Sequence, residues 1–146
     1  MTRGEADRLL RGFAEWAEEE PSLRGLALVG SWASGAARDD SDLDLMALTD
    51  QLDRWTANDI WLREIVARLG FGATTLDREV YGAARSWRVW IGQTVELELT
   101  IADTSWAATH PLDQGTRRVV GDGLVMLVDK DGLLRSVQNA ARKAGC

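Results

Sequence analysis

The segment 27–48 decides the fold and reads ALVGSWASGAARDDSDLDLMAL. Near its end, Asp42 and Asp44 alternate with leucines, and an alternation of period two predicts a strand over 43–48. Successive side chains of a strand point to opposite faces, so both aspartates emerge on the same face, with Cα atoms about 6.6 Å apart. Their carboxylates can therefore converge on one shared ion.

Two carboxylates this close repel each other and are poorly solvated on a strand that buries its other face, and a divalent cation between them relieves this cost. Mg²⁺ is the natural occupant, because it is usually held by one or two carboxylates together with substrate phosphates. A calcium loop that starts at Asp40 is excluded, because Leu45 and Gln51 stand where such a loop requires glycine and glutamate. We therefore expect a magnesium site at Asp42 and Asp44.

The first half of the segment offers a place for phosphate. Residues 26–29 have the length of a buried strand, and Gly30 and Ser31 follow where that strand should end. Glycine lets the backbone approach a ligand closely, and a short helix over 31–37 would direct its first amides at an anion. A P-loop is excluded because no Gly-Lys-Ser/Thr follows Gly30. The whole unit suits a metal-bound triphosphate.

This pattern resembles the nucleotidyltransferases of the DNA polymerase β superfamily, which share Gly-Ser, a spacer of similar length and Asp-x-Asp. The matching residues are Gly30, Ser31, Asp42 and Asp44. The flanking residues are similar to a small bacterial group that includes aminoglycoside and lincosamide nucleotidyltransferases and the minimal nucleotidyltransferase antitoxins. Many of these relatives carry an arginine at the position of Ser34, which leaves Arg38 as the cation that this loop offers to a nucleotide.

The resemblance implies a fold and a reaction. The fold is α/β (α+β), with a mixed sheet of about five strands and helices packed mainly on one side, and with the aspartate face left open as the cleft. The reaction is the transfer of a nucleoside monophosphate to a hydroxyl of a small molecule or a protein. It would depend on one or two Mg²⁺ ions, and the donor would be ATP or another nucleoside triphosphate.

A third carboxylate is expected from a later strand of such an enzyme. The run TVELELTI at 94–101 puts Glu96 and Glu98 on one face and apolar residues on the other. If this strand lies beside Asp42 and Asp44, one glutamate completes the metal site or acts as the general base on the acceptor hydroxyl. We favour Glu98 slightly over Glu96. The alternative is that Glu96 and Glu98 simply lie on the solvent-exposed face of a half-buried sheet.

The length and composition of the chain limit its domain number, its location and its disulfide content. The chain has 146 residues, of which 45% are hydrophobic and 27% charged, and this length predicts a single nucleotidyltransferase domain over 1–146. No apolar run approaches the roughly 18 residues needed to cross a bilayer, and the N-terminus lacks a signal-peptide core, so we expect a cytoplasmic protein without membrane association. The only cysteine is Cys146, which excludes a disulfide within the chain.

The charge distribution favours some partners over others. A net charge of −6 argues against a nucleic-acid partner, because that affinity rests on Lys and Arg that neutralise phosphates. Residues 111–146 carry six basic and four acidic side chains, so 1–110 hold a net −8. An acidic cleft suits a cationic or polyhydroxylic acceptor.

The acceptor and the partner are less defined by the sequence. Only about 35 residues follow His110, whereas antibiotic-modifying relatives carry a helical substrate domain there. A homodimer, or a complex with a helical toxin-like protein, would then complete the pocket. The alternative function is an antitoxin-like or degenerate nucleotide-binding module that acts through a partner protein.

Periodicity, caps and breakers predict the elements outside the motif. Thr2 and Glu5 have the spacing of a capping box at the start of the first helix, and Gly70 ends the second. Besides the short helix over 31–37, helices are predicted over 2–19, 57–69, 116–120 and 131–143. Strands are predicted over 26–29, 43–48, 75–81, 85–91, 94–101 and 125–129.

Overall fold

The computed structural model describes residues 2–38, 41–71, 75–81, 84–91 and 94–144. It does not describe the side chains of 75–77, 79–81, 91, 94–96 and 144. The strands are β1 (Leu23–Val29), β2 (Leu43–Thr49), β3 (Thr75–Tyr81), β4 (Ala84–Ile91), β5 (Thr94–Asp103) and β6 (Leu124–Asp129). The helices are α1 (Arg3–Glu19), α2 (Gly30–Ser34), α3 (Leu52–Thr56), α4 (Ile60–Arg68), the 3₁₀ helix η1 (Thr104–Ala107), α5 (Gln114–Asp122) and α6 (Leu133–Ala144).

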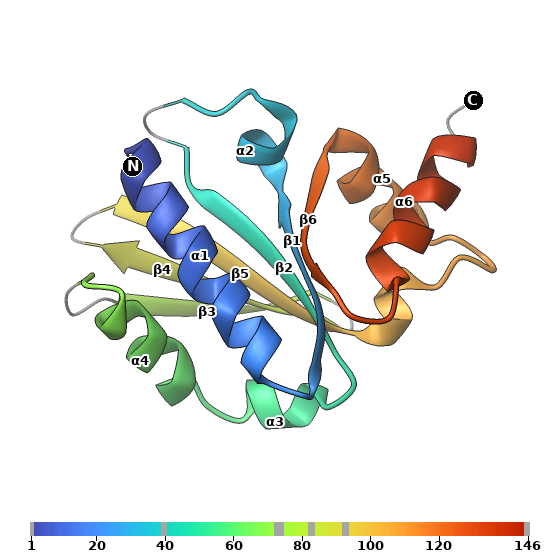
Figure 1. The fold of residues 1–146 in the computed structure, drawn as a ribbon. Helices are drawn as coiled ribbons and strands as arrows, with labels where there is room; N and C mark the ends of the chain where they lie inside the picture. Colours follow the sequence, from blue (N-terminus) through green and yellow to red (C-terminus); the bar gives the residue numbers. More distant parts are fainter. Residues whose placement is uncertain (1, 39–40, 72–74, 82–83, 92–93, 145–146) are drawn as a thin grey trace.

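The described strands form one six-stranded sheet in the order β3-β4-β5-β2-β1-β6 (Figure 1). β2 and β5 pair in parallel, and the other neighbouring pairs of described strands are antiparallel. This confirms the predicted α+β fold with a mixed sheet. The parallel pair lies in the middle of the sheet, so the strand that follows the Gly-Ser helix lies directly beside the strand with the two glutamates.

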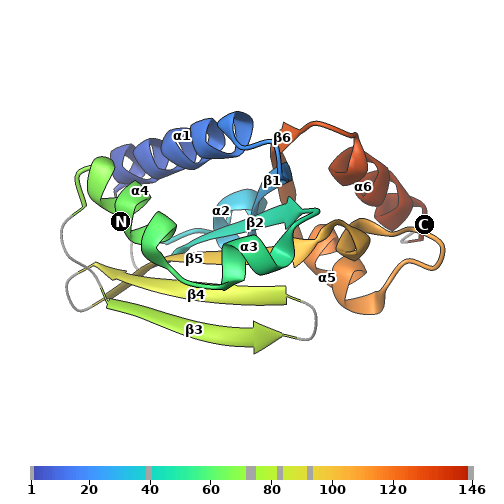
Figure 2. The ribbon, with the colours of Figure 1, turned by 90° about the horizontal axis from the view of Figure 1, so that it is seen from below.

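One face of the sheet carries the larger core. Alternate residues of β2 and β5, such as Leu45 and Leu99, pack against α1, α3 and α4, which lie together on this side (Figures 1 and 2). Trp16 of α1 stacks on Trp61 of α4 with ring centroids 5.1 Å apart, and Trp55 of α3 meets both rings edge-on. Three of the seven tryptophans therefore join these helices to each other, which agrees with packing rather than ligand contact.

The opposite face is covered at one end only. Met46 and Leu48 of β2 pack in a second cluster with Val120 of α5 and with Leu134 and Val137 of α6. Figures 1 and 2 show α5 and α6 beside β6, away from α4. The same face carries small and polar residues toward the start of β2 and the middle of β5. The second face therefore has a helical cover at the β6 end and an open part next to it.

Helix boundaries differ from the prediction where local caps decide them. α2 ends at Ser34 rather than at residue 37, because Gly35 adopts a left-handed conformation at φ 82°. α5 begins earlier than predicted, since Asp113 caps it by accepting a hydrogen bond from the N–H of Thr116. The short helices α3 and η1 were not predicted, because each is too short to show a helical period.

The capping box of α1 is formed as predicted. The N–H of Glu5 donates to Thr2 Oγ1, and the N–H of Thr2 donates to Glu5 Oε1, each at 3.1 Å. Replacement of Thr2 by alanine is expected to lower the free energy of unfolding by about 1 kcal/mol, since an orphan amide then loses its partner. Chemical denaturation measures this change. The serine variant retains the cap, and an equal loss in Thr2→Ser would contradict this explanation.

No helix in the described part of the chain is both long and apolar enough to cross a bilayer.

Candidate active site

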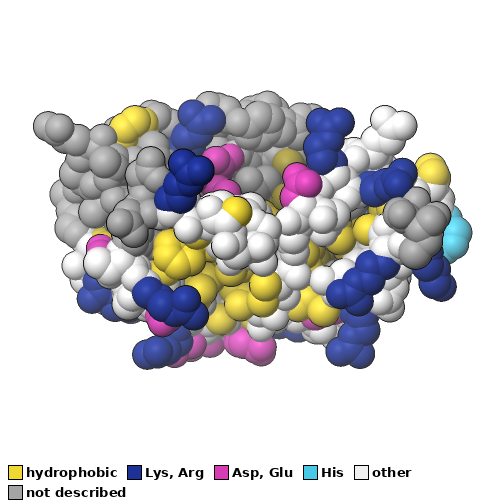
Figure 3. All heavy atoms as spheres, turned by 90° about the horizontal axis from the view of Figure 1, so that it is seen from above, with side chains coloured by type: hydrophobic (Ala, Val, Ile, Leu, Met, Phe, Trp, Pro, Cys, Tyr) yellow, Lys and Arg dark blue, Asp and Glu magenta, His cyan; other side chains and the backbone are white. Residues whose placement is uncertain are grey.

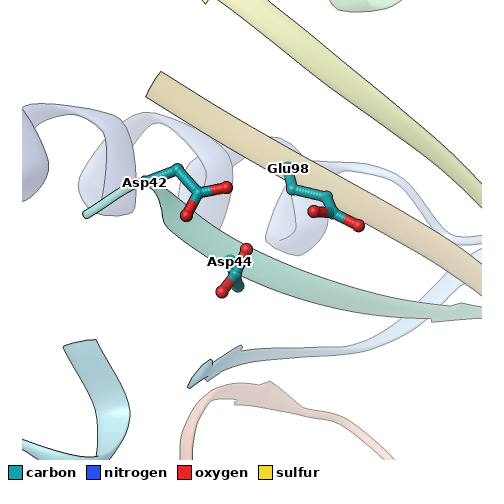
Figure 4. A group of neighbouring side chains, drawn as sticks. All are labelled: Asp42, Asp44 and Glu98. Atoms are coloured by element: carbon teal, nitrogen blue, oxygen red, sulfur yellow. The ribbon is translucent and has the colours of Figure 1, made fainter. Parts of the chain in front are cut away.

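Three carboxylates meet on the open part of the second sheet face (Figure 4). Asp44 of β2 is paired in register with Glu98 of β5, and Asp42 directly precedes β2. One oxygen from each residue lies within 4.8 Å of the other two, and all three residues are half-buried. Parallel pairing brings them together because it sets Leu43 against Leu97, so the next residue of each strand points to the same face.

Of the glutamates whose side chains the structure describes, Glu98 belongs to this group. The side chain of Glu96, the other candidate, lies outside the described residues. Glu98 Oε1 accepts a hydrogen bond from Ser86 Oγ at 3.0 Å, and Arg88 Nε lies 3.9 Å from Glu98 Oε2. Both partners come from β4, on the side of Glu98 away from Asp44. The sequence did not indicate these two partners, because their place beside Glu98 depends on the β4–β5 register.

Gly30 lies against Asp44 at the start of α2. Its φ is 72°, in the left-handed region that favours glycine, and a Cβ at this position would overlap the carboxylate of Asp44. Both the backbone conformation and the space therefore require glycine. Gly30 brings the first turn of α2, which contains the half-buried Ser31, next to the carboxylate group.

The turn between α2 and β2 carries Arg38. This residue is exposed, and its N–H donates to Ser41 Oγ at 2.8 Å. The indole Nε1 of Trp32 donates to the carbonyl of Ser41 at 3.4 Å, which ties α2 to the residue before Asp42. Trp32 therefore contributes a hydrogen bond that holds Ser41 close to α2.

Among the three carboxylates, Asp44 has a clearly shifted pKa. Burial, and then the negative charges of Asp42 and Glu98, raise the pKa of Asp44 to about 7. A carboxyl group with so high a pKa is poorly stabilised as an anion by its surroundings. Among the described residues, the neighbours that shift this pKa are both negatively charged, and a bound cation would provide the opposite charge.

Two adjoining cavities open over the carboxylates. The first has a volume of about 270 Å³ and is lined by Gly30, Asp44 and Glu98, and by Val119 and Asp122 of α5. The second, of about 600 Å³, shares four lining residues with the first: Met46, Glu98, Thr100 and Val119. It extends over Ala84 and Ala102 to Trp106, with Asp103 and Asp113 also in its lining. The wall formed by Val119 and Asp122 of α5 was not predicted, because neither residue belongs to a motif.

Charged side chains of both signs lie on the face of the molecule that is seen from above. Figure 3 shows acidic side chains near the middle of the face seen from above, with Lys and Arg side chains on both sides of them.

Comparison with known proteins gives one family and several distant structures. The model of the streptomycin adenylyltransferase family matches residues 4–145. No curated protein matches the chain. A solved toxin-antitoxin structure with AMP-PNP aligns over 99% of this chain and 87% of its own, at 15% identity and a TM-score of 0.43.

Two uridylyl-transferring enzymes are also similar. The Cid1 poly(U) polymerase aligns over 82% of this chain and 33% of its own, at 15% identity and a TM-score of 0.45. Terminal uridylyl transferase 4 from Trypanosoma brucei with bound dUTP aligns over 65% of this chain and 34% of its own, at 21% identity and a TM-score of 0.41. The aligned part is about a third of each of these two enzymes.

A mixed sheet that carries a Gly-Ser helix and three carboxylates on one face is the arrangement of polymerase-β-type nucleotidyltransferases, and the chain is an enzyme of this class. The resemblance seen in the sequence is thereby confirmed. Within this class the chain belongs to the streptomycin adenylyltransferase family, whose model spans all of it except residues 1–3 and 146.

Proposed function

We propose that the chain transfers AMP from ATP to a hydroxyl group with the help of Mg²⁺ held by Asp42, Asp44 and Glu98. The observation that carries this proposal is the cluster of three carboxylates, in which one oxygen from each residue lies within 4.8 Å of the other two. One oxygen from each of these residues would hold the Mg²⁺, because this ion prefers carboxylate oxygens as protein ligands. The raised pKa of Asp44 gives a second reason for a cation here.

The residues of the chain divide the remaining work. The amides of Gly30 and Ser31 and the Ser31 hydroxyl bind the β- and γ-phosphates, and Arg38 offsets the phosphate charge. Asp42, Asp44 and Glu98 would hold Mg²⁺, as one ion or two, and the bound metal would supply positive charge to the reacting phosphate and the leaving oxygen. The acceptor oxygen attacks the α-phosphorus in line, the bond to the bridging oxygen breaks, and pyrophosphate leaves. In this proposal Glu98 takes the acceptor proton.

The acceptor is proposed to enter the larger cavity. Pyrophosphate held at α2 would lie on one side of the carboxylates, and the cavity of about 600 Å³ extends away on the other side, beyond Glu98. Trp106 and the alanines supply apolar contact, whereas Asp103 and Asp113 add negative charge. A cationic, hydroxylated small molecule of the streptomycin type fits this lining and the family description. A protein acceptor is the other substrate class.

The domain, the location and the partners of the enzyme are proposed from its sequence. We place the activity in a single domain over 1–146 in the cytoplasm, with no nucleic acid as acceptor. A second copy of the chain, or a helical partner protein of the toxin type, would complete the acceptor pocket. An antitoxin-like or degenerate module would bind MgATP through the same residues without releasing pyrophosphate.

Calorimetric titration with MgATP tests the site. The wild type is expected to bind MgATP and to lose most of that affinity in EDTA, because the metal links the carboxylates to the phosphates. The double variant Asp42→Asn/Asp44→Asn is expected to bind ATP equally weakly with and without Mg²⁺. Equal, metal-independent binding by the wild type and the variant would refute the assignment of the site.

Metal binding should also depend on pH. Because the pKa of Asp44 is about 7 without metal, a cation that binds at pH 6 must displace its proton. The apparent affinity for Mg²⁺ is therefore expected to rise about tenfold per pH unit below about pH 7 and to level off above it. Titrations in buffers of different ionisation enthalpy measure the released proton. An affinity that stays constant across this range would contradict the prediction.

A further inference from the structure

We propose that Ser86 is a positioning residue that fixes the carboxylate of Glu98 for metal binding. This inference rests on the proposed function, because it assigns a role toward the same metal site. Ser86 lies on β4, one strand further from Asp44 than Glu98, and it does not itself line either of the two cavities. It reaches the site through its hydrogen bonds to Glu98 and Thr100, of which Glu98 carries the carboxylate.

The contacts of Ser86 form a short chain of hydroxyl groups. Ser86 is 2% exposed and is paired in register with Thr100. Its Oγ lies 3.0 Å from Glu98 Oε1 and 3.0 Å from Thr100 Oγ1. Glu98 is two residues before Thr100 on the same face of β5, so the serine reaches it diagonally across the strand pair.

The direction of these hydrogen bonds follows from which of the three oxygen atoms carries a proton that it can donate. An ionised carboxylate only accepts, so Ser86 must use its one O–H toward Glu98. The contact between the two hydroxyls then requires Thr100 to donate to Ser86. The chain therefore runs from Thr100 through Ser86 to Glu98, and each bond strengthens the next.

This chain limits the rotation of the carboxylate. Ser86 of β4 donates a hydrogen bond to Glu98 Oε1, and Arg88, also of β4, has its Nε 3.9 Å from Glu98 Oε2. Rotation of the carboxylate would cost Ser86 its charge-assisted hydrogen bond and leave it the weaker, neutral contact with Thr100. Glu98 is therefore held in one orientation before a cation arrives, and partners of this kind tune metal affinity.

The test uses Mn²⁺ alone as the probe, with the free ion followed by electron paramagnetic resonance. Ser86→Ala is expected to bind Mn²⁺ roughly tenfold more weakly than the wild type. Ser86→Thr keeps the hydroxyl and is expected to restore most of the affinity. Thr100→Val leaves the bond from Ser86 to Glu98 in place and is expected to weaken binding less than Ser86→Ala. Thermal unfolding without metal measures any loss of stability separately.

The outcomes separate this proposal from the function on which it rests. Asp44→Asn is measured beside the serine variants. If Asp44→Asn loses Mn²⁺ binding and Ser86→Ala keeps the wild-type affinity, the positioning role is overturned while the metal site stands. If Asp44→Asn binds Mn²⁺ as the wild type does, both proposals fail. A larger loss in Thr100→Val than in Ser86→Ala would overturn the order of the hydroxyl chain.

Discussion

Replacement of Asp44 by asparagine is expected to abolish nucleotidyl transfer while making the metal-free protein more stable. The loss of activity should be on the order of a thousandfold, because a bound metal stabilises the transition state by several kcal/mol. A change of about 1.4 kcal/mol in the activation free energy alters the rate tenfold. Asparagine is close to aspartate in size, so the fold has room for it. Opposite changes in activity and stability would identify Asp44 as a functional rather than a structural residue.

The sign of the stability change follows from the pKa of Asp44. This pKa is raised to about 7, so the folded protein binds the proton more tightly than the unfolded chain. The stability that the proton contributes is fully present below about pH 4 and is lost as the pH rises through 7. At pH 8 in EDTA the asparagine variant is therefore expected to melt roughly 2–4 °C above the wild type.

The matched control is Asp7→Asn, at an exposed position on α1. It should change neither transfer nor the melting temperature, because exposed substitutions are usually neutral. Added Mg²⁺ should raise the melting temperature of the wild type and of Asp7→Asn, but not that of Asp44→Asn. A variant Asp44→Asn that still responds to Mg²⁺ would contradict the role of this carboxylate.

Replacement of Gly30 by alanine is expected to have the second largest effect. The positive φ of Gly30 costs alanine about 1–2 kcal/mol. In addition, the new Cβ would overlap the carboxylate of Asp44, so this group or α2 must move. A displacement of about 1 Å at a reacting site can cost a hundredfold in rate, and we expect a loss of at least that order. Turnover and Mn²⁺ binding measure it.

Gly35 provides the control for Gly30. Its φ of 82° is similar, but nothing lies within 4 Å of a Cβ built at this position. Gly35→Ala should therefore carry the same backbone cost in thermal unfolding and leave Mn²⁺ affinity unchanged. If both alanine variants lose Mn²⁺ affinity equally, backbone strain rather than contact with Asp44 explains the effect of Gly30→Ala.

Much of the fold could be predicted because its signals are local. The alternation around Asp42 and Asp44 places both on one strand face, and the same alternation selects the face of Glu98. The break at Gly30 and the capping box at Thr2 mark helix starts through neighbouring residues alone. Every predicted strand corresponds to a strand of the structure, because each run of apolar residues is bounded by turn residues.

The rest of the site depends on contacts between distant segments. The sequence does not reveal that β5 pairs in parallel with β2, which decides that Glu98 meets Asp44. Ser86 and Asp122 are ordinary polar residues until β4 and α5 bring them to the carboxylates. The raised pKa of Asp44 also arises only from this assembly, since burial and two neighbouring charges cause it.

Transfer of label from ATP tests the central claim most directly. The protein, Mg²⁺ and ATP labelled at either the α- or the γ-phosphate are incubated with aminoglycosides that include streptomycin, with lincosamides, or with cell extract. The account predicts that α-label becomes attached to an acceptor, that γ-label leaves as pyrophosphate, and that Asp44→Asn stops both. Attachment of γ-label to the acceptor, or transfer of α-label that persists in Asp44→Asn, would contradict it.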